Sequence, residues 1–258
     1  MTDSSITKAQ PDHISTSQAG SSPMGLFGQK NQTEPLIAAQ PDESRQAPML
    51  REELVMVNAP HSQLAEQYRR MRNSVQAMNA DGAARSIMMT SAIEGEGKSV
   101  TTVNLAVAMA ELSGQRVCIV DANRFNPSVE NYMSMPQRQG LGELLASKLT
   151  MDEALRRTSV DRLDVIGAGG NDTNLVLNVD RVRSLLNTLK RRYDYVLLDS
   201  PAVLRANHPS LLASIADGIL IVVRMGHTPK QLVEEAVGML ENLGGNLLGT
   251  CATAVEGI

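Results

Sequence analysis

The 258-residue sequence predicts an α/β fold, a doubly wound and mostly parallel sheet with helices on both faces, preceded by a disordered tail. Three observations predict it. Strand-like and helix-like segments alternate over most of the chain. The strand-like segments are continuous apolar runs, which is typical of parallel strands covered on both faces. A glycine-rich loop links the first strand of the main domain to a helix.

The composition divides the chain into three parts. Residues 1–48 are rich in Ser, Gln, Pro, Asp and Thr, and they bury too little apolar surface to offset the entropy of ordering. We therefore expect a disordered polar tail there. Residues 49–80 form a lead-in segment, and residues 81–258 form the main domain, in which strands and helices alternate.

Local signals place the elements in order. In the lead-in segment, "ELVMVN" at 53–58 predicts a short extended piece, and a helix at 62–80 is capped by Ser62. In the main domain the apolar run "SIMMTS" predicts the first strand, and the helix after it ends near Gly114, because glycine is a common helix terminator. The main domain is expected to contain strands at 86–91, 116–121, 163–169, 194–200, 218–224 and 247–255 and helices at 98–113, 140–147, 178–192, 208–215 and 229–243.

Charge and hydropathy exclude several classes of function. The formal net charge is −4, which gives no electrostatic basis for binding nucleic acid, so no nucleic-acid partner is expected. No apolar run approaches the about 18–20 residues that span a bilayer, and the first residues are polar rather than signal-like. We therefore expect a soluble, cytoplasmic protein that could dock onto a membrane partner.

Residues 92–99 follow the Walker A pattern, with Ala92 where the first glycine usually stands. The pattern lies between a strand and a helix, as a phosphate-binding loop requires. Glycines in this loop let backbone N–H groups turn toward phosphate oxygens, and the helix after it presents its positive end. Lys98 can reach the β- and γ-phosphates, and the Ser99 hydroxyl can ligate Mg²⁺. With ATP and Mg²⁺ as cofactors, the expected nucleotide-binding residues are Glu94, Gly95, Glu96, Gly97, Lys98, Ser99 and Val100.

Two further apolar runs end in a carboxylate. "VCIVD" ends at Asp121 and "YVLLD" ends at Asp199. Because ligands of such sheets bind at the carboxyl ends of parallel strands, both side chains are expected beside the phosphate loop. The predicted metal ligands are Ser99, Asp121 and Asp199, and the predicted catalytic residues are Lys98, Asp121 and Asp199, with Asp121 as the candidate base.

Four stretches together resemble the bacterial tyrosine kinase (BY-kinase) family of capsule and exopolysaccharide biosynthesis, within the MinD/ParA-like P-loop ATPases. They are "TSAIEGEGKSVTTVNLAVAMA", "VCIVDANRFNPS", "YDYVLLDSPAV" and "DGILIVVRMGHT", similar to the family's Walker A, Walker A′, Walker B and late-strand regions. The resemblance covers roughly residues 53–256. It implies a P-loop NTPase fold, an ATP-binding kinase-like domain at 81–258 and an ATP-dependent protein-tyrosine (auto)kinase regulating polymer synthesis and export. Its implied partner is a membrane polysaccharide co-polymerase, a chain-length protein.

The spacing Glu66-x-x-Arg69-x-x-Arg72 matches the family's E-x-x-R-x-x-R motif. Positions three residues apart lie along one face of a helix. An ordinary solvated helix face would look the same. The lead-in "LVMVNAPHSQLAEQYRRMR" as a whole resembles that of the family, which implies an oligomerisation helix at 62–80 and a ring-shaped homo-oligomer with Glu66, Arg69 and Arg72 at its interface.

The sequence departs from the family pattern at places that keep other functions open. Asn123 stands where Walker A′ has its second aspartate, Thr253 replaces a late-strand asparagine, and no tyrosine follows Tyr195. A regulatory pseudokinase that binds Mg·ATP without transferring phosphate to tyrosine is one alternative. A MinD/ParA-like ATPase switch is another. A dinucleotide oxidoreductase is disfavoured, because the loop lacks G-x-G-x-x-G.

Overall fold

The computed structural model describes residues 51–254 except 84, 171–177 and 206–207, and for residues 208–210 it describes the backbone only. The tail predicted at 1–48 lies outside the described residues, as does the end of the strand predicted at 247–255. The strands are β1 (Arg85–Ser91), β2 (Val117–Asp121), β3 (Arg156–Arg157), β4 (Leu163–Ile166), β5 (Tyr195–Asp199), β6 (Gly218–Arg224) and β7 (Leu247–Thr253).

These strands form one sheet in the order β3-β4-β2-β5-β1-β6-β7. Every neighbouring pair is parallel except β3 with β4. Strands β5, β2, β4 and β3 lie on one side of β1, and β6 and β7 lie on the other side, as in a doubly wound sheet. Such sheets bind ligands at the carboxyl ends of their strands. The predicted fold class is confirmed.

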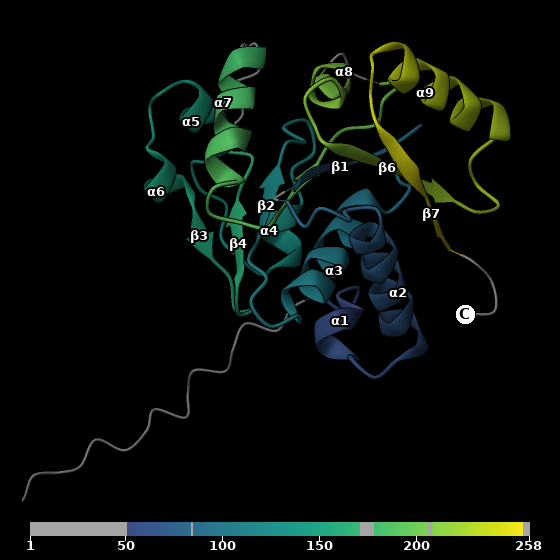
Figure 1. The fold of residues 1–258 in the computed structure, drawn as a ribbon, viewed down its shortest axis with the longest axis horizontal. Helices are drawn as coiled ribbons and strands as arrows, with labels where there is room; N and C mark the ends of the chain where they lie inside the picture. Colours follow the sequence, from purple (N-terminus) through teal and green to yellow (C-terminus); the bar gives the residue numbers. More distant parts are fainter. Residues whose placement is uncertain (1–50, 84, 171–177, 206–207, 255–258) are drawn as a thin grey trace, which may run out of the picture. The chain divides into compact units, whose positions relative to one another are not determined.

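Helices cover both faces of the sheet (Figure 1). They are α1 (Val55–Asn58), α2 (Gln63–Ala77), α3 (Lys98–Ala110), α4 (Val129–Tyr132), α5 (Leu141–Leu145), α6 (Met151–Ala154), α7 (Val179–Leu189), α8 (His208–Ala213) and α9 (Lys230–Asn242). Helices α1 to α4 pack on one face, and α5 to α9 pack on the other. Of the described residues, none form a helix long and apolar enough to cross a membrane.

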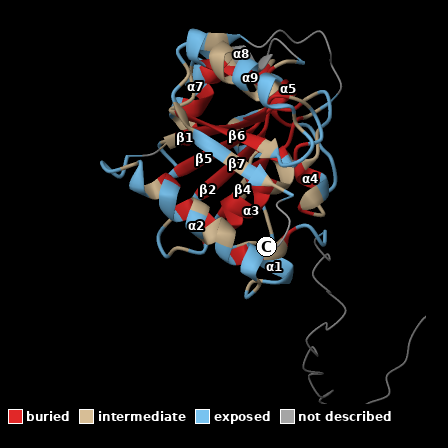
Figure 2. Cartoon of the chain, turned by 90° about the vertical axis from the view of Figure 1, so that its right-hand side faces the viewer, coloured by how far each residue is buried: buried red, intermediate tan, exposed pale blue. Residues whose placement is uncertain are grey.

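The alternation of side chains along each strand divides the core in two. In β1, Ile87 and Met89 belong to the cluster with α2 and α3, whereas Met88 belongs to the cluster with α7 and α9. Strands β2 and β5 are buried along their whole length, as their continuous apolar runs indicated. Figure 2 shows these central strands and α3 buried between the outer elements, with β7 more exposed at the edge.

The lead-in segment differs from its prediction. Residues 53–58 were expected to be extended, but Val55–Asn58 form helix α1. Its geometry follows from contacts with α3, because the Asn104 side chain accepts a hydrogen bond from the Met56 N–H at 3.1 Å and donates to Glu53 O at 2.9 Å. Leu54 and Met56 are buried against the same helix. These partners lie far away in the sequence, so a local pattern could not indicate them.

Asp217, just before β6, links three elements at the end of the sheet where β1 and β6 begin, which is opposite the end with the phosphate loop. Its carboxylate accepts hydrogen bonds from the Ser86 N–H and hydroxyl, both at 2.7 Å, and from Lys190 Nζ at 2.9 Å. Burial works against the charged form, but the Ser86 N–H and the Lys190 ammonium outweigh it, so the pKa of Asp217 is lowered. A carboxyl group with a lowered folded-state pKa stabilises the fold above its unfolded pKa of about 4.

Asp217→Asn is expected to lower the free energy of unfolding by about 1–3 kcal/mol at pH 7, because charged hydrogen bonds are lost. The deficit relative to the wild type should shrink as the pH falls below about 4, where the wild-type carboxyl also becomes protonated. Urea unfolding at several pH values measures both effects, with Asp161→Asn as the control at an exposed carboxylate. A deficit that grows toward low pH would contradict this account.

Candidate nucleotide site

The candidate site lies at the carboxyl ends of β1, β2 and β5. The parallel register pairs Asp121 at the end of β2 with Asp199 at the end of β5, and Asp199 with Met89 of β1. The chain leaving β1 forms the loop at residues 92–97, and α3 begins directly after it at Lys98. The sheet therefore brings the two predicted aspartates and the predicted phosphate loop to one place.

The loop has the backbone conformation that its glycines allow. Gly95 and Gly97 have φ values of 80° and 87°, in the left-handed region that other residues rarely adopt. Glu96 anchors the loop to β7 and to the turn after β6: Thr253 donates its hydroxyl to Glu96 O at 2.9 Å, and Thr228 donates to the Glu96 carboxylate. This carboxylate is 1% exposed, and burial raises its pKa. Glu96, predicted to bind the nucleotide, thus uses its side chain to hold the loop in place.

Lys98, the first residue of α3, is buried in the site, with 4% of its side chain exposed. Its Nζ is 3.2 Å from Oε2 of Glu94. The other carboxylate oxygen of Glu94 accepts a hydrogen bond from the Ala202 N–H at 3.2 Å. Glu94 was predicted only as a member of the loop, and its link to the segment after β5 was not indicated by the motif.

Ser99 and Asp199 form the part of the site best suited to a metal ion. The Ser99 hydroxyl donates to Asp199 Oδ2 at 2.5 Å. The other oxygen, Oδ1, is buried and has no hydrogen-bond partner among the described residues. Burial raises the pKa of Asp199, and the Ser99 hydroxyl and Lys98 act in the opposite direction. A buried carboxylate oxygen beside a hydroxyl fits Mg²⁺, which binds one or two carboxylates together with substrate phosphates. Across the described part of the chain, no group of three or more His, Cys, Asp or Glu could hold a metal by itself.

Asp121 is buried beside Asp199 and holds the loop that follows β2. Its Oδ1 accepts a hydrogen bond from the Asn123 N–H at 3.0 Å, and its Oδ2 accepts from the N–H groups of Ser128 and Val129 at 3.0 and 3.1 Å. Burial raises the pKa of Asp121, and the negative charge of Asp199 raises it further. A raised pKa suits a group that must take up a proton near neutral pH. Its catalytic role stays a prediction.

A cavity of about 330 Å³ opens beside the phosphate loop, between α2 and β7. Tyr68 and Met71 of α2 line one side, Thr101 of α3 lies at the base, and Cys251 and Thr253 of β7 line the other side. Its apolar walls and its contact with Gly97 make it the candidate site for a nucleotide base. The sequence singled out Thr253, but it did not indicate that α2 and β7 line one cavity, because no motif connects them.

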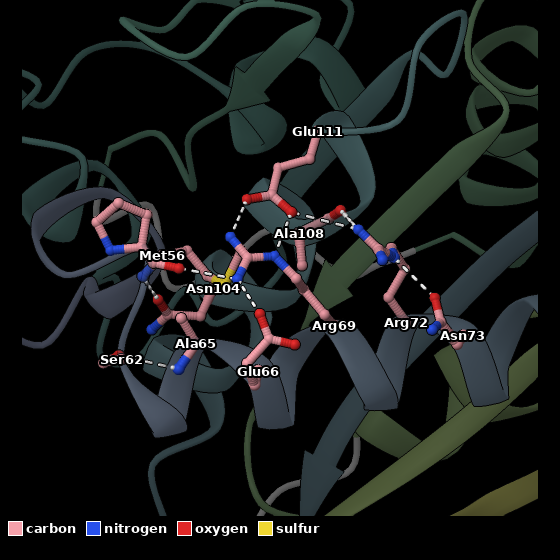
Figure 3. Close-up of polar contacts among 11 residues, drawn as sticks. Met56, Ser62, Ala65, Glu66, Arg69, Arg72, Asn73, Asn104, Ala108 and Glu111 are labelled. Atoms are coloured by element: carbon pink, nitrogen blue, oxygen red, sulfur yellow. Dashed lines mark hydrogen bonds and ion pairs between the residues drawn. The ribbon is translucent and has the colours of Figure 1, made fainter.

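The predicted interface residues make contacts within the chain (Figure 3). Arg69 binds both carboxylate oxygens of Glu111, through Nε at 2.9 Å and Nη2 at 2.6 Å, and contacts Glu66 at 2.5 Å. Arg72 is buried and donates to Ala108 O at 2.9 Å. The two arginines therefore hold α2 against the C-terminal end of α3. Glu66 is more exposed, with 56% of its side chain accessible, and the interface role of the three residues stays a prediction.

Known proteins and solved structures are similar to this chain over most of its length. A family model described as an AAA domain matches residues 84–244. Tyrosine-protein kinase YwqD of Bacillus subtilis is 31% identical over 198 residues, which are 76% of this chain and 83% of YwqD. Succinoglycan biosynthesis transport protein ExoP of Rhizobium meliloti is 29% identical over 78% of this chain, but the match spans 26% of ExoP. The solved BceF tyrosine kinase domain has a TM-score of 0.69 and 31% identity, covering 77% of this chain and 81% of that domain.

Arg72→Ala is expected to lower the free energy of unfolding by about 2 kcal/mol, because it removes a charged hydrogen bond and the packed stem that join α2 to α3. Chemical denaturation measures the change. Arg70→Ala is the matched control, since Arg70 is an exposed arginine on the same helix. Equal effects of the two substitutions would show that the Arg72 contacts do not stabilise the fold.

Proposed function

This chain belongs to the bacterial tyrosine kinase family within the P-loop ATPases, and we propose that it is an ATP-dependent protein-tyrosine kinase acting in capsule or exopolysaccharide biosynthesis. The observation that carries the proposal is the arrangement of Lys98, Ser99 and Asp199 around one end of the phosphate loop. ATP and Mg²⁺ are the proposed cofactors, and residues 94–100 are the proposed nucleotide-binding residues. ExoP is named for succinoglycan biosynthesis, which supports the polymer assignment.

Each residue has a defined task in phosphoryl transfer. Bound Mg²⁺ supplies positive charge against the phosphates. Ser99 and Asp199 would hold it, and Lys98 would neutralise charge on the terminal phosphate. Asp121 takes the proton of the tyrosine hydroxyl, whose oxygen forms the new bond to the γ-phosphorus while the bond to the bridging oxygen of ADP breaks. Most of the acceleration then comes from positioning and electrostatics, as is general for this reaction.

The acceptor tyrosine is proposed to lie on another protein. Of the four tyrosines of this chain, Tyr193 and Tyr195 are buried, and Tyr68 and Tyr132 are partly buried. Tyr193 donates its hydroxyl to Asp164 at 2.6 Å, and the Tyr195 hydroxyl accepts a hydrogen bond from Asn79 at 3.2 Å. Tyr68 lines the cavity beside the phosphate loop, where burial raises its pKa to about 12. Tyr193 and Tyr195 therefore cannot reach a γ-phosphate without leaving the core.

A membrane polysaccharide co-polymerase is the proposed partner, and it would hold this chain at the inner face of the membrane. The support is the match to ExoP, in which the similar region is about a quarter of a longer transport protein. We also propose a homo-oligomeric ring in which Glu66, Arg69 and Arg72 lie at the contact between subunits. In that ring α2 would join the subunit contact to α3 and thus to the nucleotide.

A nucleotide switch without tyrosine transfer is the second candidate function. Asn123 favours it, since it is a neutral residue in the loop after β2. Its side chain accepts a hydrogen bond from the Asn126 N–H at 3.3 Å, so it organises the loop without adding negative charge to the site. Following labelled phosphate from ATP to tyrosine or to water separates the two functions.

Purified protein, Mg²⁺ and γ-labelled ATP are expected to transfer label to a random Glu/Tyr copolymer. Lys98→Ala should reduce the transfer on the order of 100-fold, because a buried cation that stabilises the transferring phosphate is lost. Lys148→Ala is the control, since Lys148 is exposed and distant in sequence from the loop. Label released only as inorganic phosphate would establish the switch instead, and the absence of both products would leave a pseudokinase.

Glu66→Ala is expected to weaken self-association about ten-fold while leaving the fold intact, because the proposed subunit contact loses a charged residue whose pairing within the chain is exposed. Sedimentation velocity over a concentration series measures the change. Glu241→Ala, at an exposed glutamate on α9, provides the control. Equal self-association of both variants and the wild type would remove Glu66 from the interface.

A further inference from the structure

Glu94 joins two hydrogen-bond donors at the phosphate end of the site. Its Oε2 is 3.2 Å from Lys98 Nζ, and its Oε1 accepts from the Ala202 N–H at 3.2 Å. Lys98 is the first residue of α3, and Ala202 follows Asp199 at the end of β5. One carboxylate therefore links the phosphate loop to the segment that leaves the metal-binding strand.

Both donors are of the kind that a terminal phosphate uses. The lysine of a Walker A loop reaches the β- and γ-phosphates. Switch segments of nucleotide-binding proteins are held by contacts to the γ-phosphate and its metal. A carboxylate and a phosphate are both anionic acceptors, and two anions that share the same donors repel each other. The Glu94 carboxylate and a γ-phosphate therefore compete for Lys98 and Ala202.

The exposures indicate which group moves. The Glu94 side chain is 47% exposed, whereas that of Lys98 is 4% exposed. Glu94 can turn into solvent, where water replaces its hydrogen bonds, but the lysine is confined by its surroundings. Glu96, the other carboxylate of the loop, is buried and bound to Thr228, so it cannot turn into solvent when a phosphate binds.

We infer that Glu94 is a specificity-determining residue that weakens the binding of nucleoside triphosphate relative to diphosphate. The inference rests on the proposed function, since it needs a nucleotide in this site. A diphosphate leaves Glu94 in contact with Ala202. A triphosphate expels Glu94 into solvent and takes its donors, so the segment after β5 changes its partner from Glu94 to the γ-phosphate.

Calorimetric titration of the full chain with Mg·ADP and with Mg·AMP-PNP, which is not turned over, tests the inference. Glu94→Gln should tighten AMP-PNP binding about ten-fold and change ADP binding less than about two-fold, because the γ-phosphate, which only the triphosphate carries, competes with the carboxylate for both Lys98 and Ala202. Glu94→Ala should shift the ratio in the same direction, which separates loss of the charge from new hydrogen bonds of the amide. Glu241→Gln, the control, should leave both affinities unchanged.

The outcomes separate the inference from the proposed function. If the wild type binds both nucleotides and neither Glu94 variant changes the ratio of their affinities, the inference is wrong and the nucleotide site stands. If the wild type binds neither nucleotide, both fail. Thermal unfolding without nucleotide checks that the variants are folded, as expected for a substitution at a half-exposed side chain.

Discussion

The parallel register of β1, β5 and β2 is the constraint on which the site depends. It pairs Asp121 with Asp199 across neighbouring strands and places the loop after β1 beside them. Two buried carboxylates next to each other are costly, and burial together with their mutual repulsion raises the pKa of Asp121. A bound cation lowers that cost, so the electrostatics that oppose folding of the apoprotein favour Mg²⁺ binding. The unpartnered Oδ1 of Asp199 marks where that favourable interaction would form.

Helix α3 connects this site with α2, the helix that is predicted to lie at a subunit interface. It begins with Lys98 and Ser99 at the phosphate loop and ends at Ala110, beside Glu111, which both Arg69 and Arg72 contact. The arginines expected at a subunit contact thus stabilise the chain itself. If the proposed ring uses them as well, a neighbouring subunit would have to share or replace these intramolecular bonds. Its binding would then change the contacts at the end of α3. Helices α2 and α3 alone would then link the proposed assembly to the proposed nucleotide site.

The parts of the fold that the sequence predicted are those encoded by local patterns. Strands β1, β2 and β5 are continuous apolar runs, and the phosphate loop is marked by glycines with positive φ. The short elements α1, α4, α6 and β3 were missed, because segments of two to four residues carry no periodicity. Contacts between distant residues were missed as well: Arg69 binds Glu111, and Glu94 binds the Ala202 N–H. A motif specifies which residues can meet a ligand, but only the packed structure gives the partners they have within the chain.

The central claim is that Ser99 and Asp199 form the metal end of an ATP site whose lysine is Lys98. A crystal structure with Mg²⁺ and AMP-PNP tests it most directly. The account predicts the metal ion within ligand distance of the Ser99 hydroxyl, with Asp199 beside it, and Lys98 Nζ on the phosphates in place of Glu94. A nucleotide bound elsewhere, or a metal ion held without Ser99 and Asp199, would contradict it.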